Sequence, residues 1–217
     1  MAMDKLPKAH KPTVKFRRMK DKRRLQIMEA ALKTFAGRGM AAAGIAEISR
    51  AAHISVGTFY LYFQNKEDLL FQLMDECAME LRQTLATAFN DKAEPMDRFE
   101  NAGRAFFREF CNKRREMVIL LLRESVGVSQ RVEDRRKEIF QVLISDVAGA
   151  IGRVAGRKGR GAKRRDEVVA VSLFGMLERV AYHYYIWETG FRDLRKVEDE
   201  ALAFIRDGLG SVMPKGN

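Results

Sequence analysis

Apolar residues recur at helical spacing along nearly the whole of this chain. Leu25, Met28, Leu32 and Phe35 follow one another at intervals of three or four residues, which places their side chains on one face of a helix. Similar stripes continue as far as Leu209, and the strict alternation of a half-buried strand is not found. Only 4 of the 217 residues are proline, so few positions interrupt a helix. The sequence therefore predicts an all-α fold.

The pattern predicts nine helices, of which three are close to the N-terminus and six are longer. Ser55 and Asn65 stand where N-caps are expected, before the third and fourth helices. The expected helices begin at Asp21, Ile45 and Val56 and then cover about 66–88, 95–110, 114–125, 130–155, 166–188 and 194–212. The chain should thus form a small N-terminal three-helix domain followed by a larger helical bundle.

Positive charge is concentrated in the first part of the chain. Residues 1–65 contain 13 basic and 4 acidic side chains, whereas residues 66–217 contain 27 and 25. Residues 1–20 hold two prolines and no apolar period, so we expect a flexible basic arm there. A basic end on a nearly balanced remainder indicates an anionic partner, and nucleic acid is the most common one.

The composition also excludes several classes of protein. The longest apolar run, Met117–Leu122, has six residues, and a membrane-spanning helix needs about 20. Cysteine occurs only at Cys77 and Cys111, which leaves no disulfide framework and no cysteine-ligated zinc site. Phosphate-binding glycine loops, serine elbows and Cys–His pairs are missing, so we expect no enzyme activity, no cofactor and no metal. The chain is expected to be cytoplasmic, without a membrane partner.

Two short helices joined by a tight turn, His53–Ser55, are the components of a helix–turn–helix. The second of them must enter the major groove of DNA. Phe59 and Phe63 are four residues apart and are expected to pack inward. Thr58 and Tyr62 lie on a different face, which offers hydroxyl groups to phosphates.

Residues 27–73 resemble the DNA-binding domain of the TetR family of bacterial transcriptional regulators. The most specific part is the string S-x-G-T-x-Y-x-Y-F-x-x-K-E-x-L, which runs from Ser55 to Leu69. Further matching residues are Ala30, Ala31, Phe35, Gly39, Ile45, Ile48, Ala51, Ala52 and Leu70.

The resemblance implies a homodimer that binds a palindromic operator in double-stranded DNA and that a small molecule releases. Residues 21–66 would form the DNA-binding domain, and residues 67–217 the ligand-binding and dimerisation domain. Most members of the family repress transcription. The resemblance implies phosphate contacts for Thr58, Tyr60, Tyr62 and Lys66. It implies base contacts for Val56, Gly57 and Thr58. Arg50 would make a further contact with the DNA backbone.

The chain departs from the family pattern in the short helices. Thr and Ser often precede the second helix, but Ala43 and Gly44 stand here, so that contact with phosphate is lost. The turn usually carries Gly, and His53 replaces it, which implies a positive φ at a non-glycine residue. Val56 and Leu61 leave the reading helix without charge. We expect the basic arm to compensate by reaching phosphates or the minor groove.

The expected helix 166–188 is apolar nearly all round. One side includes Val168 and Val171, and the other includes Phe174 and Ala181. One of the two sides can pack into the subunit, and the other then needs a partner. A second copy of the chain is the simplest partner. We expect helices 166–188 and 194–212 of two subunits to form a four-helix dimer interface.

The effector is expected to be apolar or amphipathic. Candidate ligand contacts are the large apolar side chains of the C-terminal helices, although each of them also suits an ordinary core. They are Phe99, Phe106, Phe110, Met117, Leu121, Phe140, Phe174 and Tyr182. Arg123 and Glu124 either orient a polar ligand head or face water at a helix end. Residues 156–165 contain three glycines and six cations and are expected to form an exposed loop, either mobile or a second nucleic-acid patch.

Two other functions compete with a ligand-released repressor. One is a non-specific DNA-organising protein that uses only the basic head and shows no operator preference. The other is a transcriptional activator with the same fold.

Overall fold

The computed structural model describes residues 14–89, 92–188, 190 and 193–211. Every regular element in this part of the chain is helical, which confirms the all-α prediction. The first four helices are α1 (Val14–Arg38), α2 (Ile45–Ala51), α3 (Val56–Tyr60) and α4 (Lys66–Ala88). They are followed by α5 (Pro95–Ala105), α6 (Arg115–Ile119), α7 (Gln130–Val154), α8 (Arg160–Ala181) and α9 (Leu194–Gly210). Three wider π-helical segments extend α5, α6 and α8, namely η1 (Phe106–Asn112), η2 (Leu120–Glu124) and η3 (Tyr182–Trp187).

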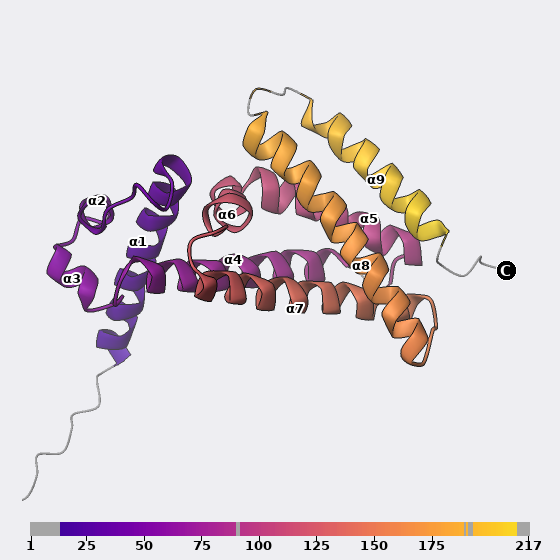
Figure 1. Ribbon diagram of the computed structural model, residues 1–217, viewed down its shortest axis with the longest axis horizontal. Helices are drawn as coiled ribbons and strands as arrows, with labels where there is room; N and C mark the ends of the chain where they lie inside the picture. The colour runs from indigo at the N-terminus through magenta and orange to yellow at the C-terminus, as the bar shows by residue number, and fades with distance from the viewer. Residues whose placement is uncertain (1–13, 90–91, 189, 191–192, 212–217) are drawn as a thin grey trace, which may run out of the picture.

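The helices are arranged as a small head and a longer bundle (Figure 1). Helices α1, α2 and α3 gather at one end, and we call residues 21–66 the head. Helices α4 and α7 lie side by side and run away from it, while α8 packs on α7 and α9 packs on α5. Helix α4 contacts both α1 and α5, so it connects the head to the bundle.

The predicted caps are found at the beginnings of α3 and α4. The Ser55 hydroxyl accepts a hydrogen bond from the Thr58 amide at 3.0 Å, and the Asn65 side chain accepts one from the Asp68 amide at 2.8 Å. Each cap satisfies a backbone donor that the helix itself leaves free. His53 has a φ of +51°, as its place in the turn predicts. These short-range features thus set the ends of both helices.

Three predicted boundaries are wrong. The third helix was expected to run to about Phe63 but ends at Tyr60. The other two errors understate helix length. Helix α1 begins at Val14, so residues 14–20 of the expected arm are helical. Residues 1–13 of that arm lie outside the described residues. Helix α8 begins at Arg160, six residues earlier than expected, so the basic segment 156–165 is mostly helix. Arg, Ala and Lys have high helix propensity, and this outweighs the signal of the glycines.

Large aromatic side chains form much of the core. Phe35, Phe59 and Phe63 are buried within the head, and Phe107 and Phe110 are buried in the bundle. Buried charges are few among the described residues, and Glu198 is one of them. It pairs with Arg104 at 3.2 Å and with Arg108 at 2.7 Å, which joins α9 to α5 and η1. No described helix is both long and apolar enough to span a bilayer.

We expect both cysteines to be unreactive in the folded protein. Cys77 and Cys111 are fully buried, and burial raises the pKa of each thiol because the thiolate would lose its hydration. Since the thiolate is the reactive form, modification by a disulfide reagent should be at least about a hundredfold slower than in denaturant. Colorimetric thiol titration with and without denaturant measures the difference. A thiol that reacts rapidly under native conditions would contradict the buried placement.

Candidate nucleic-acid interface and internal cavity

Two buried phenylalanines hold α3 against the rest of the head. Phe59 is 0% and Phe63 is 2% exposed, and their ring centroids are 5.6 Å apart. This confirms that both rings pack inward. Because they point into the head, the opposite face of α3 must point outward.

The outward face of α3 is uncharged and largely apolar. Val56, Tyr60 and Leu61 are 42%, 54% and 74% exposed. Gly57 and, at the end of α2, Arg50 are also exposed. Thr58 is half-buried, and its hydroxyl lies 2.8 Å from that of Ser55. A short helix with small, hydroxyl-bearing and apolar groups on its free face is suited to thymine methyl groups and phosphates in a major groove.

Lys66 is engaged inside the head. Its ammonium group donates to the backbone carbonyls of Met40, Ala41 and Ala43 at 2.7, 3.2 and 2.9 Å. These carbonyls belong to the loop between α1 and α2. A lysine has three N–H donors, and all three are used here. The structure therefore gives Lys66 a positioning role towards the loop that precedes α2.

Replacing Lys66 and Tyr60 is expected to weaken DNA binding in two different ways. Tyr60→Phe removes only an exposed hydroxyl, so affinity should fall about threefold on all duplexes while the melting temperature stays constant. Lys66→Ala leaves three carbonyls without their donor, so stability should fall by about 1–3 kcal/mol together with affinity. Fluorescence anisotropy on several duplexes and thermal unfolding measure both effects. A loss confined to one base position, or an unchanged melting temperature in Lys66→Ala, would refute these roles.

Arg123 and Glu124 connect the bundle to the head. The Glu124 carboxylate accepts a hydrogen bond from the Met40 amide at 2.7 Å, and Arg123 donates to the Ala36 carbonyl at 3.2 Å. The two side chains also pair with each other at 2.7 Å. They thus contact the C-terminal end of α1. They do not surround a ligand head, and they do not simply face water at a helix end. No spacing in the sequence indicates this contact, since the partners are more than 80 residues apart.

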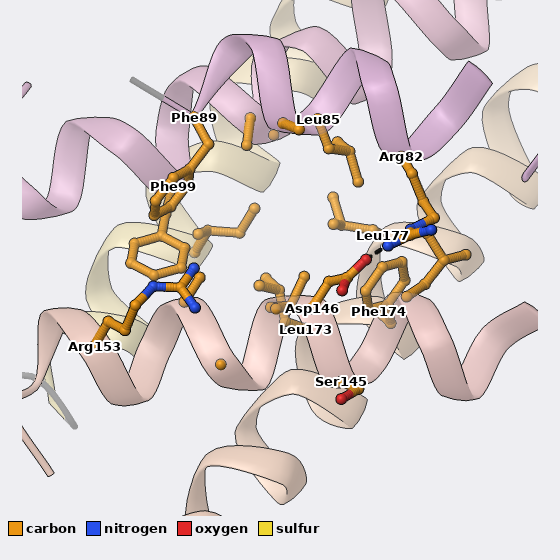
Figure 2. A pocket seen from close by; sticks show the side chains of 18 residues that line it. Arg82, Leu85, Phe89, Phe99, Ser145, Asp146, Arg153, Leu173, Phe174 and Leu177 are labelled. Carbon is orange, nitrogen blue, oxygen red and sulfur yellow. Dashed lines mark hydrogen bonds and ion pairs between the residues drawn. The ribbon is translucent and has the colours of Figure 1, made fainter. Parts of the chain in front are cut away.

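A cavity of about 480 Å³ lies among α4, α5, α7, α8 and α9. This volume is within the usual range for a small-molecule site. Its walls are mainly apolar, with Arg82 and Asp146 paired at 2.7 Å towards one end and Arg153 beside Phe99 towards the other (Figure 2). The apolar lining includes Leu85, Phe89, Phe99, Leu143, Leu173, Phe174 and Leu177.

The predicted ligand contacts coincide with this cavity at only two positions. Phe99 and Phe174 line it. The other six predicted residues are outside its lining, namely Phe106, Phe110, Met117, Leu121, Phe140 and Tyr182. Phe106, Phe110 and Leu121 are buried core residues instead. Other residues line the cavity although the sequence analysis did not single them out, among them Arg82, Phe89 and Arg153.

The head matches a family model described as bacterial regulatory proteins, tetR family, over residues 27–73. Residues 27–73 are therefore similar to the DNA-binding segment of the TetR family. The matched segment covers α2, α3 and their turn, together with parts of α1 and α4, so it contains the predicted DNA contacts from Arg50 to Lys66 but not those of the basic arm.

Relatives and solved structures that are similar to the chain are also named as regulators. The fatty acid metabolism regulator protein of Bacillus subtilis is 35% identical over 77 residues, which are 35% of this chain and 40% of that relative. This chain thus spans less than half of the length of the first matching relatives.

Two solved structures share the fold at low sequence identity. FadR from Bacillus halodurans, a fatty acid degradation regulator, has a TM-score of 0.74 at 20% identity and covers 86% of this chain and 96% of its own. The transcriptional regulator FadR from Bacillus subtilis in complex with stearoyl-CoA has a TM-score of 0.71 at 19% identity, with coverages of 85% and 98%. These relatives and structural neighbours are named as regulators.

Proposed function

We propose that this chain is a transcriptional repressor that binds an operator through its head and leaves it when a small molecule binds the bundle. The observation that carries the proposal is the exposed face of α3, which Phe59 and Phe63 hold outward in a segment that matches the family. Residues 21–66 bind double-stranded DNA in this proposal, and residues 67–217 bind the effector and dimerise. Val56, Gly57 and Thr58 meet base edges, while Arg50, Tyr60 and Tyr62 meet phosphates.

The effector in this proposal carries an apolar chain. The supporting feature is the cavity among five helices, whose lining is mainly apolar and includes three phenylalanines, Phe89, Phe99 and Phe174. A structural neighbour has been solved with stearoyl-CoA, an acyl thioester. We therefore assign to the cavity an acyl chain, or another apolar chain of similar size.

A dimer through α8 and α9 completes the proposal. Val168 and Val171 on α8 and Phe204 on α9 are 60%, 49% and 67% exposed, although they are large and apolar. The two helices contact each other within the subunit. A second copy that covers both would remove this surface from water and would place two heads on one palindromic operator.

Replacing Phe204 by aspartate is expected to weaken the dimer by about a hundredfold, because a charge would enter the centre of an apolar interface. Sedimentation velocity over a range of concentrations measures the association. Met79→Asp is the matched control, since Met79 is 57% exposed and belongs to α4, which is not part of the proposed interface. A Phe204→Asp variant that associates like the Met79→Asp variant would disprove this interface.

Selection of random duplex DNA by the purified protein tests the DNA-binding part. A two-fold symmetric enriched motif, bound by dimers according to the mass of the complex, is the expected result. Binding without an enriched motif that simply fades as the salt concentration rises would favour a non-specific DNA-organising protein instead.

A further inference from the structure

A second hollow of about 930 Å³ lies between α7 and the first half of α8. Its lining is more charged than that of the cavity. We call it the basic groove, and its charged residues are Arg153, Arg157, Lys158, Lys163, Asp166 and Glu167. Four cations against two carboxylates leave a net charge of +2.

The basic groove and the cavity adjoin along one line of α7. Ser145, Gly149 and Arg153 line both hollows, and they are four residues apart, so they follow one another along the helix surface. Gly149 has no side chain to separate the two spaces. A methyl group at Gly149 would lie 3.3 Å from Nη1 of Arg153, so the guanidinium group extends across this glycine. Arg153 therefore lies at the junction of an apolar space and a cationic one.

The cations of the basic groove differ in their partners. Arg157 is paired with Asp166, whose carboxylate is only 5% exposed and accepts from Nε at 3.0 Å. Within the described part of the chain, no hydrogen bond or ion pair joins the side chain of Arg153, Lys158 or Lys163 to another residue. Three cations without internal partners are thus free to bind an anion, and guanidinium and ammonium groups both bind phosphate well.

We propose that the basic groove binds the phosphorylated head group of the same ligand whose apolar chain fills the cavity. This inference rests on the proposed function, because it takes the cavity to be the effector site. Arg153 contacts the first anionic group beyond the chain, and Lys158 and Lys163 contact phosphates farther out. The Arg157–Asp166 pair fixes the turn between α7 and α8, which carries Lys158 and lies between Arg153 on α7 and Lys163 on α8.

Operator DNA is not the partner of this groove. Figure 1 shows the turn between α7 and α8 at the opposite end of the molecule from α2 and α3. A duplex held by α3 would have to extend along the whole bundle to reach Lys163. This position separates the groove from the proposed DNA surface of the same subunit.

Calorimetric titration with four probes tests the inference. The probes are dodecanoate, dodecyl phosphate, dodecanoyl coenzyme A and coenzyme A alone. For the wild-type protein, we expect the coenzyme A ester to bind about tenfold more tightly than the free acid, since extra charge-assisted contacts are made. An equal gain with dodecyl phosphate would assign recognition to one phosphate, and a gain only with the ester would assign it to the larger head group. Both results support a phosphorylated head.

Single variants locate the head group. Lys163→Glu and Arg153→Gln should each weaken binding of the coenzyme A ester about tenfold. The affinity of Lys163→Glu for dodecanoate should stay within about twofold of the wild-type value. Lys137→Glu is the matched control, because Lys137 is exposed on α7, the helix of Arg153, but lines neither the cavity nor the basic groove. It should change neither affinity.

Three results would overturn the inference while leaving the proposed function intact. They are an unchanged affinity of Lys163→Glu for the ester, a loss of operator affinity in this variant without ligand, and a change in its dimer mass. If wild-type protein binds none of the three apolar probes, the effector cavity itself is refuted, and the inference fails with it.

Discussion

A Phe59→Ala variant is expected to lose operator binding altogether. Phe59 is 0% exposed, and its ring lies 5.5 Å from that of Tyr60 and 5.6 Å from that of Phe63. Removing a buried phenyl ring costs about 3–5 kcal/mol, a large part of the stability of a small domain. Because α3 has only five residues, it cannot keep its orientation without this anchor. Operator affinity should fall by more than about a hundredfold, since the head is then mostly unfolded.

Thermal unfolding together with operator anisotropy measures both parts of this effect. Leu61→Ala is the matched control, because Leu61 belongs to the same turn but is 74% exposed. That variant should keep its melting temperature, and any loss of affinity would then come from the DNA surface alone. A Phe59→Ala protein that still binds the operator with wild-type affinity would contradict the role of Phe59 as the anchor of α3.

A Glu124→Ala variant is expected to bind the ligand but to respond to it poorly. The Glu124 carboxylate is the hydrogen-bond acceptor for the Met40 amide, at the point where α1 ends and the loop to α2 begins. Without it, a largely buried amide loses its partner, and the bundle loses a direct hydrogen bond to the head. We expect the ligand-induced decrease in operator affinity to shrink about tenfold, within the usual range of coupling energies.

Glu124→Gln is the control for this variant, since the glutamine side chain keeps an oxygen acceptor for the Met40 amide. Its response should stay within about threefold of the wild type. Operator affinity is measured with and without saturating dodecanoyl coenzyme A, and ligand affinity is measured separately. A Glu124→Ala protein with a full response would show that the signal reaches the head by another route, such as α4.

Features that depend on neighbours within four residues were predicted well from the sequence. Ser55 and Asn65 act as caps through contacts to Thr58 and Asp68, three residues away. The inward packing of Phe59 and Phe63 follows from their spacing. These features are decided by local chemistry that the sequence displays directly. The positive φ of His53 was implied by the family resemblance, because the turn usually carries Gly at this position.

The cavity was predicted poorly because it depends on how distant helices pack. Phe99 and Phe106 lie on one apolar stripe, but Phe99 lines the cavity and Phe106 is in the core. The difference arises from the positions of α4, α7 and α9 around them, which helical periodicity does not reveal. The roles of Arg153 and Glu124 have the same origin, since their surroundings are brought together by the tertiary fold.

In the proposed function, a molecule bound in the bundle controls DNA binding by the head. Titration of dodecanoyl coenzyme A into the complex of the wild-type protein with its selected operator, followed by fluorescence anisotropy, tests it most directly. We expect the duplex to be released as the ligand saturates the protein, with operator affinity lower by about thirtyfold or more. A complex that stays intact when calorimetry shows the ligand to be bound would contradict it.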